Sequence, residues 1–268
     1  MNSLAKTTSF ESVRAFDIIG DIAVVEIPKE LKGKGKAAAA GIAKQQKNIK
    51  AVYKKVGGHE GKLRIRELKY IYGEKRTITT HKENRVLLNL VIAKTYFSPR
   101  QATERKRVFL QIKKPEKVLV MFSGVGPFAV EIAKNTPASS VYGVELNKIA
   151  HKYATENVKL NKIEAKVKLF CGDVRKIVPK LKLRFDRIVM PLPKGAESFL
   201  PIAFSAAKKG SIIHFYDFEK EEGIAQKSVE KATTAAAAAN KKIRILAIVK
   251  CGQLAPRAYR VCVDFKII

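Results

Sequence analysis

Residues 117–145 read KVLVMFSGVGPFAVEIAKNTPASSVYGVE, and this stretch decides the fold. It begins with an apolar run that is typical of a strand buried on both faces of a sheet. Gly124 and Gly126 then let the backbone turn sharply, and Pro127 stands where a first helical turn tolerates its missing N–H. A second apolar run ends at Glu145. This order of strand, glycine turn, helix and strand predicts a parallel α/β sheet.

The same alternation continues towards the C-terminus. Five apolar runs predict parallel strands: KVLVMF, SVYGVEL, KVKLF, FDRIVM and GSIIHFY. Helices are predicted at about 127–135, 148–161, 195–208 and 221–239. The last two runs, KIRILAIVK and YRVCVDFKII, are separated only by CGQLAPRA, which is too short for a crossover helix, so they should pair antiparallel. Five parallel strands followed by an antiparallel C-terminal hairpin predict a Rossmann-like class I methyltransferase domain.

The N-terminal part has a different pattern and predicts a separate small α/β domain. FDIIGDIAVVEIP favours a strand pair around Gly20, whereas KLRIRELKYIYG and RVLLNLVIAKTYF alternate as half-buried strands do. LKGKGKAAAAGIAKQQKN favours a loop followed by a helix. We therefore predict a small α/β domain over residues 1–95 that contacts RNA, a connecting segment over 96–114, and the Rossmann-like domain over 115–268.

The charge of the chain indicates a polyanionic partner. There are 53 Lys and Arg residues against 24 Asp and Glu, which gives a net charge of +29. Self-repulsion at this level destabilises a compact protein unless a polyanion relieves it, so a nucleic acid is the expected partner. A lysine-rich thermophilic surface is the alternative, but such surfaces usually gain Glu together with Lys.

Composition also excludes several classes of protein. No stretch approaches the roughly 18 to 20 apolar residues of a bilayer span, and the N-terminus lacks the apolar segment of a secretory signal. We therefore expect a cytoplasmic protein without membrane contact. Cys171, Cys251 and Cys262 form no C-x-x-C pair and only four His accompany them, so neither a disulfide framework nor a metal site is expected.

Candidate ligand contacts stand at the ends of the predicted strands. The glycine loop lacks the third glycine of the nucleotide fingerprint, and Pro127 removes a donor that a pyrophosphate would use, so a cofactor without phosphates is favoured. Glu145 is placed to bond ribose hydroxyls, or simply to begin the next helix. Asp173 is placed to accept an adenine amine, or to cap a helix. Together with Pro191 these residues should converge on one crevice at the strand carboxyl ends.

Along residues 14–268 the sequence resembles a known family in the order and spacing of six segments. These are FDIIGDIAVVEIP, RIREL, YFSPR with TER, MFSGVGPF, VELNK and MPLPKGA. They resemble the archaeal tRNA (guanine-37-N1)-methyltransferases and their wybutosine-pathway relatives. The resemblance implies S-adenosylmethionine as cofactor, the anticodon arm of tRNA as partner, and methylation of N1 of guanosine 37. We expect a monomer without a metal.

The resemblance also implies roles for individual residues. Glu104 would act as general base, Arg105 would fix the base or a phosphate, and Arg66, rather than Arg64, would contact the target guanine. This chemistry is sound, because guanine N1 carries a proton at neutral pH and an arginine can stabilise charge growing on O6. The implied cofactor contacts are Phe97, Arg100, Phe122, Gly124, Gly126, Glu145, Leu146, Asp173, Val174 and Pro191. A plain domain linker is the alternative for residues 96–105.

Two departures from the family pattern leave alternatives open. Pro191 stands where the family usually has Asn, which loses an amide that would hold the base edge and makes Pro191 a candidate catalytic-site residue. C7 methylation of the tricyclic wyosine precursor, alone or in addition, therefore remains an alternative. Only about 15 residues precede FDIIGD, where many members carry a further domain, so fewer contacts outside the anticodon arm are expected.

Two other function classes are weaker alternatives. A related aminocarboxypropyl transferase would carry Tyr and His in the segment 191–194, which has neither. A non-catalytic RNA-binding protein would not need Gly124, Gly126, Glu145 and Asp173 together. The sequence does not identify the tRNA species.

Overall fold

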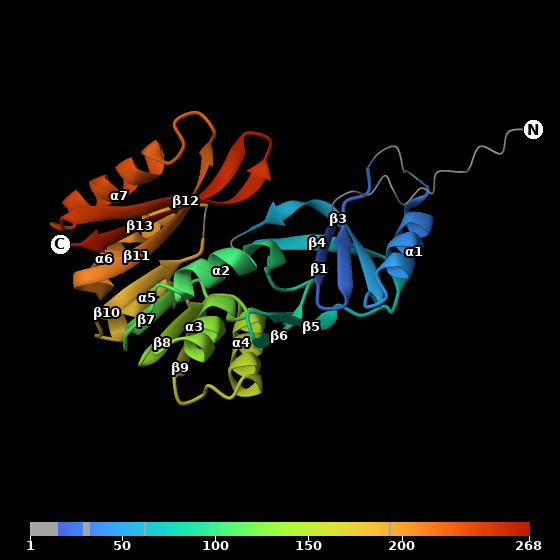
Figure 1. Cartoon of the computed structure of the whole chain (residues 1–268), viewed down its shortest axis with the longest axis horizontal. Coiled ribbons are helices and arrows are strands. Elements are labelled where there is room, and N and C mark those ends of the chain that lie inside the picture. Colours follow the sequence, from blue (N-terminus) through green and yellow to red (C-terminus); the bar gives the residue numbers. More distant parts are fainter. Residues whose placement is uncertain (1–15, 29–32, 62, 193) are drawn as a thin grey trace, which may run out of the picture. The chain divides into compact units, whose positions relative to one another are not determined.

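The computed structural model describes residues 16–28, 33–61, 63–192 and 194–268, and the chain divides into two compact units (Figure 1). The first unit comprises the described residues up to Lys82 together with Leu87–Pro99. The second comprises Glu83–Val86 and Arg100–Ile268.

The first unit contains a four-stranded sheet with the order β1-β2-β3-β4. Its strands are β1 (Phe16–Ile19), β2 (Ile22–Val25), β3 (Ala51–Glu60) and β4 (Ile65–Gly73). β2 and β3 are parallel, and helix α1 (Gly35–Gln45) connects them. The alanine run of α1 has a packing role, because Ala38, Ala39 and Ile42 are fully buried in the core of this unit. A separate two-stranded ladder joins β5 (Ile78–Glu83) and β6 (Val86–Val91).

The second unit contains a seven-stranded sheet with the order β12-β13-β11-β10-β7-β8-β9. Its strands are β7 (Lys117–Met121), β8 (Ser140–Glu145), β9 (Val167–Cys171), β10 (Phe185–Met190), β11 (Ala207–Lys220), β12 (Ile243–Ala255) and β13 (Ala258–Ile267). β7 to β11 are parallel, β13 is antiparallel to β11, and β12 lies at the edge. The predicted five parallel strands with an antiparallel C-terminal hairpin are confirmed.

The helices of this unit are α2 (Ala102–Phe109), α3 (Pro127–Asn135), α4 (Lys148–Leu160), α5 (Val174–Lys180), α6 (Leu200–Ala206) and α7 (Gln226–Ala238). Short 3-10 turns cover η2 (Pro99–Gln101) and η3 (Ala196–Phe199). None of the helices in the described part of the chain is long and apolar enough to span a membrane.

Element boundaries differ from the prediction in three places. The helix expected over 195–208 is η3 followed by α6, and β11 already begins at Ala207. α7 begins at Gln226 rather than near 221, because Gly223 and Ala225 adopt left-handed φ angles that no helix accommodates. β3 and β5 were not predicted, because their lysines, glycines and threonines hide the alternation of apolar residues.

The two faces of the large sheet carry different side chains. On one face, apolar residues of the central strands pack in one core with residues of α5, α6 and α7, among them Leu119, Met121, Ile188, Met190, Ile213 and Phe215. Side chains alternate along a strand, so the residues between them point to the other face. These include Arg187, His214, Tyr216 and Asp264, which are all buried.

Candidate functional site

The glycine loop follows β7 directly and reverses the chain within a few residues. Phe122, Gly124 and Gly126 adopt φ angles of +58°, +59° and +89°, and Gly126 precedes the first turn of α3. A non-glycine residue in the left-handed region is strained, and such residues cluster at ligand sites. The loop therefore presents its backbone at the carboxyl end of the first parallel strand.

Glu145 anchors this loop from the end of β8. Its Oε2 accepts the N–H of Gly124 at 2.7 Å, and its Oε1 accepts the N–H of Asn147 at 2.7 Å. Burial raises the pKa of Glu145, although backbone N–H groups oppose the shift. Each carboxylate oxygen can accept a second hydrogen bond. The expected bond to ribose hydroxyls is compatible with this geometry and stays a prediction.

Asp173 caps α5, as one of the two alternatives expected, since its Oδ1 accepts the N–H of Arg175 at 2.8 Å. The Arg175 guanidinium lies 4.0 Å from the centroid of the Phe199 ring, and that ring lies edge-on to Phe122 at 4.8 Å. A cation and two aromatic rings thus connect the start of α5 with the glycine loop. The contact of Asp173 with adenine stays a prediction.

Three other predicted cofactor residues lie at the same strand edge. Leu146 follows Glu145 and is 45% exposed, so it offers an apolar surface to a ligand. Val174 is 3% exposed and packs in the core, so it can meet a ligand only through its backbone. Pro191 is half-buried directly after β10. Pro193 lies outside the described residues.

Glu104 lies in the first turn of α2 and is 5% exposed. Its Oε1 accepts the phenol O–H of Tyr216 at 2.6 Å, and Arg107 donates to both of its carboxylate oxygens at 2.8 Å. Tyr216 follows Phe215, whose register partner is Met190, the last residue of β10. The carboxylate is therefore tied to the strand edge at which the glycine loop and Glu145 stand.

Arg107 connects Glu104 to a longer series of hydrogen-bonded polar side chains. It also donates to Asp264, whose Oδ1 lies 2.6 Å from Nδ1 of His214. Nε2 of the same imidazole lies 2.8 Å from Nη1 of Arg187. Arg187 in turn donates through Nε to Glu116 at 2.7 Å. We use the name buried network for the following seven residues: Glu104, Arg107, Asp264, His214, Arg187, Glu116 and Tyr216.

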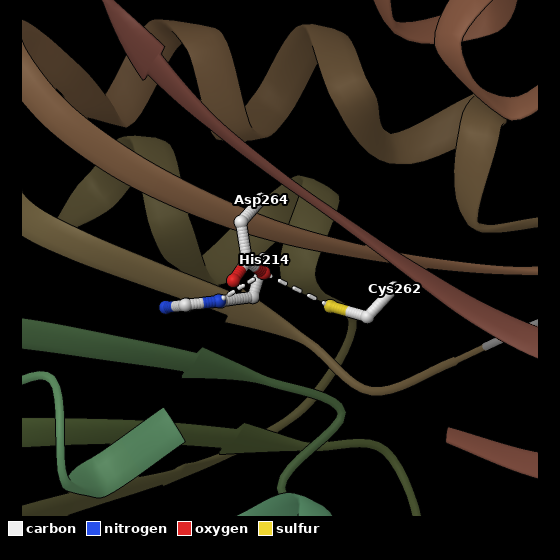
Figure 2. Close-up of side chains that lie close together, drawn as sticks. All are labelled: His214, Cys262 and Asp264. Atoms are coloured by element: carbon white, nitrogen blue, oxygen red, sulfur yellow. Dashed lines mark hydrogen bonds and ion pairs between the residues drawn. The ribbon is translucent and has the colours of Figure 1, made fainter. Parts of the chain in front are cut away.

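Figure 2 shows the centre of this network, where His214, Cys262 and Asp264 come together. Their donor atoms are close enough for a metal ion, but they already bind one another, because the Cys262 thiol donates to Asp264 Oδ1 at 3.2 Å. Burial also raises the pKa of Cys262, which keeps the thiol protonated. The guanidinium groups of Arg107 and Arg187 flank the cluster and repel a cation. We therefore assign no metal to it.

Arg105 does not lie where the expected contact with base or phosphate would place it. It is 2% exposed and donates to Glu131 Oε1 at 2.9 Å and to Glu83 Oε2 at 2.6 Å. Both carboxylates are buried, and burial raises the pKa of Glu131. The Arg105 guanidinium is therefore engaged in the interior by two carboxylates, which would be left uncompensated without it, and it is not available to RNA.

The first unit contains two other predicted residues, Arg66 and Phe97. Both line a cavity of about 100 Å³ between β4 and the segment that follows β6. Arg64 lines it as well, with its guanidinium 5.0 Å from the centroid of the Tyr96 ring. The Phe97 ring also lies edge-on to His81 at 5.0 Å. The rest of the lining is largely apolar and also contains the ion pair between Lys55 and Asp17, so the contact of Arg66 with guanine stays a prediction.

Arg100 belongs to the second unit, in η2, and its side chain is exposed. Its role in cofactor binding stays a prediction. Sequence reasoning missed the buried network apart from Glu104. A signal was available, because Arg187, His214 and Asp264 interrupt apolar runs that otherwise predict fully buried strands.

Comparison with known proteins gives consistent matches along the chain. The family described as TRM5/TYW2 methyltransferase domain matches residues 79–246, and the TYW2 N-terminal domain matches residues 2–77. The chain is 43% identical over 253 residues to tRNA (guanine(37)-N(1))-methyltransferase Trm5b of Pyrococcus abyssi, covering 94% of this chain and 74% of that protein. It is 33% identical to tRNA (guanine(37)-N(1))/4-demethylwyosine(37)-methyltransferase Taw22 of Nanoarchaeum equitans, covering 95% and 100%.

Solved structures agree with these matches. Trm5b from Pyrococcus abyssi superposes with a TM-score of 0.88 at 41% identity, covering 100% of this chain and 81% of that one. A complex of aTrm5 with tRNALeu gives 0.84 at 30% identity, covering 96% and 74%. Pyrococcus horikoshii TYW2 in complex with MeSAdo gives 0.81 at 28% identity, covering 96% and 91%.

The placement of Arg105 predicts a structural phenotype. Arg105→Gln leaves Glu83 and Glu131 buried without their cation, so the free energy of unfolding should fall by about 3 to 5 kcal/mol. Denaturant titration measures this loss. Lys106→Gln is the matched control, because it removes the same charge from the adjacent exposed position. If Arg105→Gln is as stable as this control but binds RNA more weakly, Arg105 contacts RNA after all.

Proposed function

The chain belongs to the TRM5/TYW2 methyltransferase family, and we propose that it methylates N1 of guanosine 37 in tRNA with S-adenosylmethionine as the methyl donor. The single observation that carries the proposal in this chain is the position of Glu104. A buried carboxylate, tied to the strand edge beside the glycine loop, is what proton removal from guanine N1 requires.

The residues around the glycine loop fit S-adenosylmethionine. A ribose diol needs a carboxylate acceptor, and Glu145 retains acceptor capacity beyond its two backbone bonds. The cofactor has no phosphate, in keeping with a loop in which Pro127 supplies no N–H. Leu146 and Phe122 offer apolar surface to the adenosine and methionine parts. When bound, S-adenosylmethionine supplies the methyl group.

We propose that Glu104 takes the N1 proton as the methyl group arrives. Arg66 is our proposed contact for the guanine, where a guanidinium stabilises charge on O6. The net charge of +29 supplies the attraction for tRNA phosphates, and the anticodon arm is the part that carries position 37. We further propose that the protein acts as a monomer in the cytoplasm.

A second reaction is favoured by one residue. Pro191 offers a rigid ring and a carbonyl acceptor where an amide would hold the guanine edge. A less selective wall of this kind suits a flatter, larger base, so we propose C7 methylation of the wyosine precursor as an additional activity. The similarity to Taw22, whose name covers both reactions, supports this alternative.

Glu104→Gln should separate chemistry from binding. Its amide cannot accept the N1 proton, so methyl transfer should slow by roughly 10² to 10⁴ while cofactor and tRNA affinities stay nearly unchanged. Single-turnover assays on tRNA with unmodified G37, read by mass spectrometry of the digested product, measure this. Wild type should form 1-methylguanosine, and a parallel assay on precursor-bearing tRNA tests the second reaction. Absence of product from both tRNAs contradicts the proposed function.

Glu145→Ala should abolish recognition of the ribose. Hydrogen bonds to a charged group contribute about 1.5 to 3 kcal/mol each, so wild type should bind S-adenosylmethionine at least tenfold more tightly than an analogue lacking both ribose hydroxyls. In Glu145→Ala the two ligands should bind equally. Because the substitution also frees the glycine loop, the informative quantity in the calorimetric titration is this ratio. A ratio that persists in the variant removes Glu145 from the ribose site.

A further inference from the structure

We propose that Asp264 and His214 are positioning residues for methyl transfer, which act through Arg107 to hold the Glu104 carboxylate in place. The inference rests on the proposed function, in which Glu104 receives the proton. Neither residue contacts the glycine loop or Glu104 in the described structure. Their influence passes through side chains packed between α2 and the face of the sheet formed by β10, β11 and β13.

The two hydrogen bonds of the His214 ring fix its protonation. Its Nε2 lies 2.8 Å from Nη1 of Arg187, and a guanidinium has only donors to offer. Nε2 must therefore carry a lone pair, which leaves the ring proton on Nδ1, facing Asp264 at 2.6 Å. Complete burial lowers the pKa of His214 as well, although Asp264 opposes the shift. His214 is thus a neutral imidazole in one defined tautomer.

Two donors fix the orientation of the Asp264 carboxylate. The Nδ1–H of His214 donates to Oδ1, so this oxygen is held from the side of β11. Arg107 donates to Oδ2 from the side of α2. Burial alone would raise the pKa of Asp264, but its contacts with His214 and Arg107 outweigh this and hold the pKa far below its usual range. Asp264 is therefore an ionised carboxylate with a fixed orientation.

Arg107 connects the fixed Asp264 carboxylate to Glu104. Arg107 is a planar fork whose Nε and Nη2 donate to the two oxygens of Glu104 while Nη1 donates to Asp264. Turning the Glu104 carboxylate requires turning the guanidinium, which Asp264 resists. A misplacement of about 1 Å at a reacting group can cost 10²-fold in rate, so this restraint matters for chemistry.

The network acts by position and charge rather than by conducting the proton. Arginine keeps its proton in proteins, so Arg107 cannot pass one from Glu104 to Asp264. With His214 neutral, the network holds three carboxylates against two guanidinium groups. It therefore carries one negative charge before the reaction and becomes neutral when Glu104 accepts the proton from guanine.

The other groups that face Glu104 keep their charge over the range of an assay. Tyr216 on β11, Cys251 on β12 and Cys262 on β13 all interact electrostatically with Glu104. Burial raises the pKa of Tyr216 and of Cys262 well above their usual values, and that of Cys251 to about 12. The ionised groups around Glu104 are thus Arg107, with Asp264 behind it, and Arg260 on β13, which interacts electrostatically with Cys251, as Glu104 does. Arginine keeps its charge at every assay pH, so Arg260 contributes a constant background.

Asp264→Asn tests the proposal by single-turnover kinetics as a function of pH. The NH₂ of the new amide must face the N–H of either Arg107 or His214. One of these two hydrogen bonds is therefore lost, and the Arg107 guanidinium is no longer held in one orientation. We expect methyl transfer to slow 10- to 100-fold while the dissociation constants for cofactor and tRNA change less than threefold. The acid limb of the rate profile should move to lower pH, because Arg107 then shares its charge with Glu104 alone.

Arg107→Gln provides a second variant with the opposite signature. It deprives Glu104 of its neighbouring cation, so the acid limb should move to higher pH. Opposite shifts from two substitutions in one chain of contacts are not produced by a general loss of stability. If Asp264→Asn does not fold, His214→Gln removes the other end of the Asp264 contact, and the proposal then requires slower methyl transfer in this variant at unchanged cofactor and tRNA affinity.

Asp217→Asn is the matched control. Asp217 is a buried carboxylate on β11 next to Tyr216, but its partners are Lys231 and Ser228, outside the network. Asp217→Asn should lower the melting temperature without shifting the acid limb of the rate profile. The proposal is overturned by the following result. Wild type methylates position 37, but the acid limb stays at the same pH in both network variants. Their rates then fall only in proportion to their loss of stability, as in Asp217→Asn. If wild type forms no product, the proposed function itself has failed.

Discussion

A buried carboxylate must have partners that replace its hydration, and this requirement governs the second unit. Glu104 is almost inaccessible and receives a guanidinium and a phenol in exchange for water. The guanidinium of Arg107 needs a second carboxylate, Asp264, and that carboxylate needs His214. Glu104 and Arg107 lie on α2, whereas Tyr216 and His214 lie on β11 and Asp264 lies on β13, so the packing of α2 on the sheet depends on this chain of polar contacts.

The two candidate subsites replace the hydration of a buried carboxylate in different ways. Glu145 is satisfied by backbone N–H groups of the glycine loop and of the start of α4, so it can keep acceptor capacity for a ligand. Glu104 is satisfied by side chains, whose charge can be shared with distant groups. The first arrangement suits recognition of neutral hydroxyls, and the second suits a group that changes charge during a reaction.

The sheet and the glycine loop could be predicted from sequence because they depend on local patterns. Apolar runs, Gly124, Gly126 and Pro127 impose their conformation within a few residues. The contacts of Arg105 and Asp264 could not be predicted in this way, since their partners are distant in sequence. An arginine beside a candidate base resembles a substrate contact until the fold shows two carboxylates around it. The family resemblance named Glu104 but not what holds it.

The tautomer of His214 orients Asp264 and, through it, Arg107 and Glu104, so the whole network depends on it. Nitrogen-15 NMR of the histidine-labelled protein measures it directly. At pH 6, below the ordinary histidine pKa of about 6.5, we predict a protonated Nδ1 and an unprotonated Nε2 that accepts a hydrogen bond from Arg187. The same result should hold at pH 8. An imidazolium signal for His214 at pH 6, or a proton on Nε2, would contradict the account.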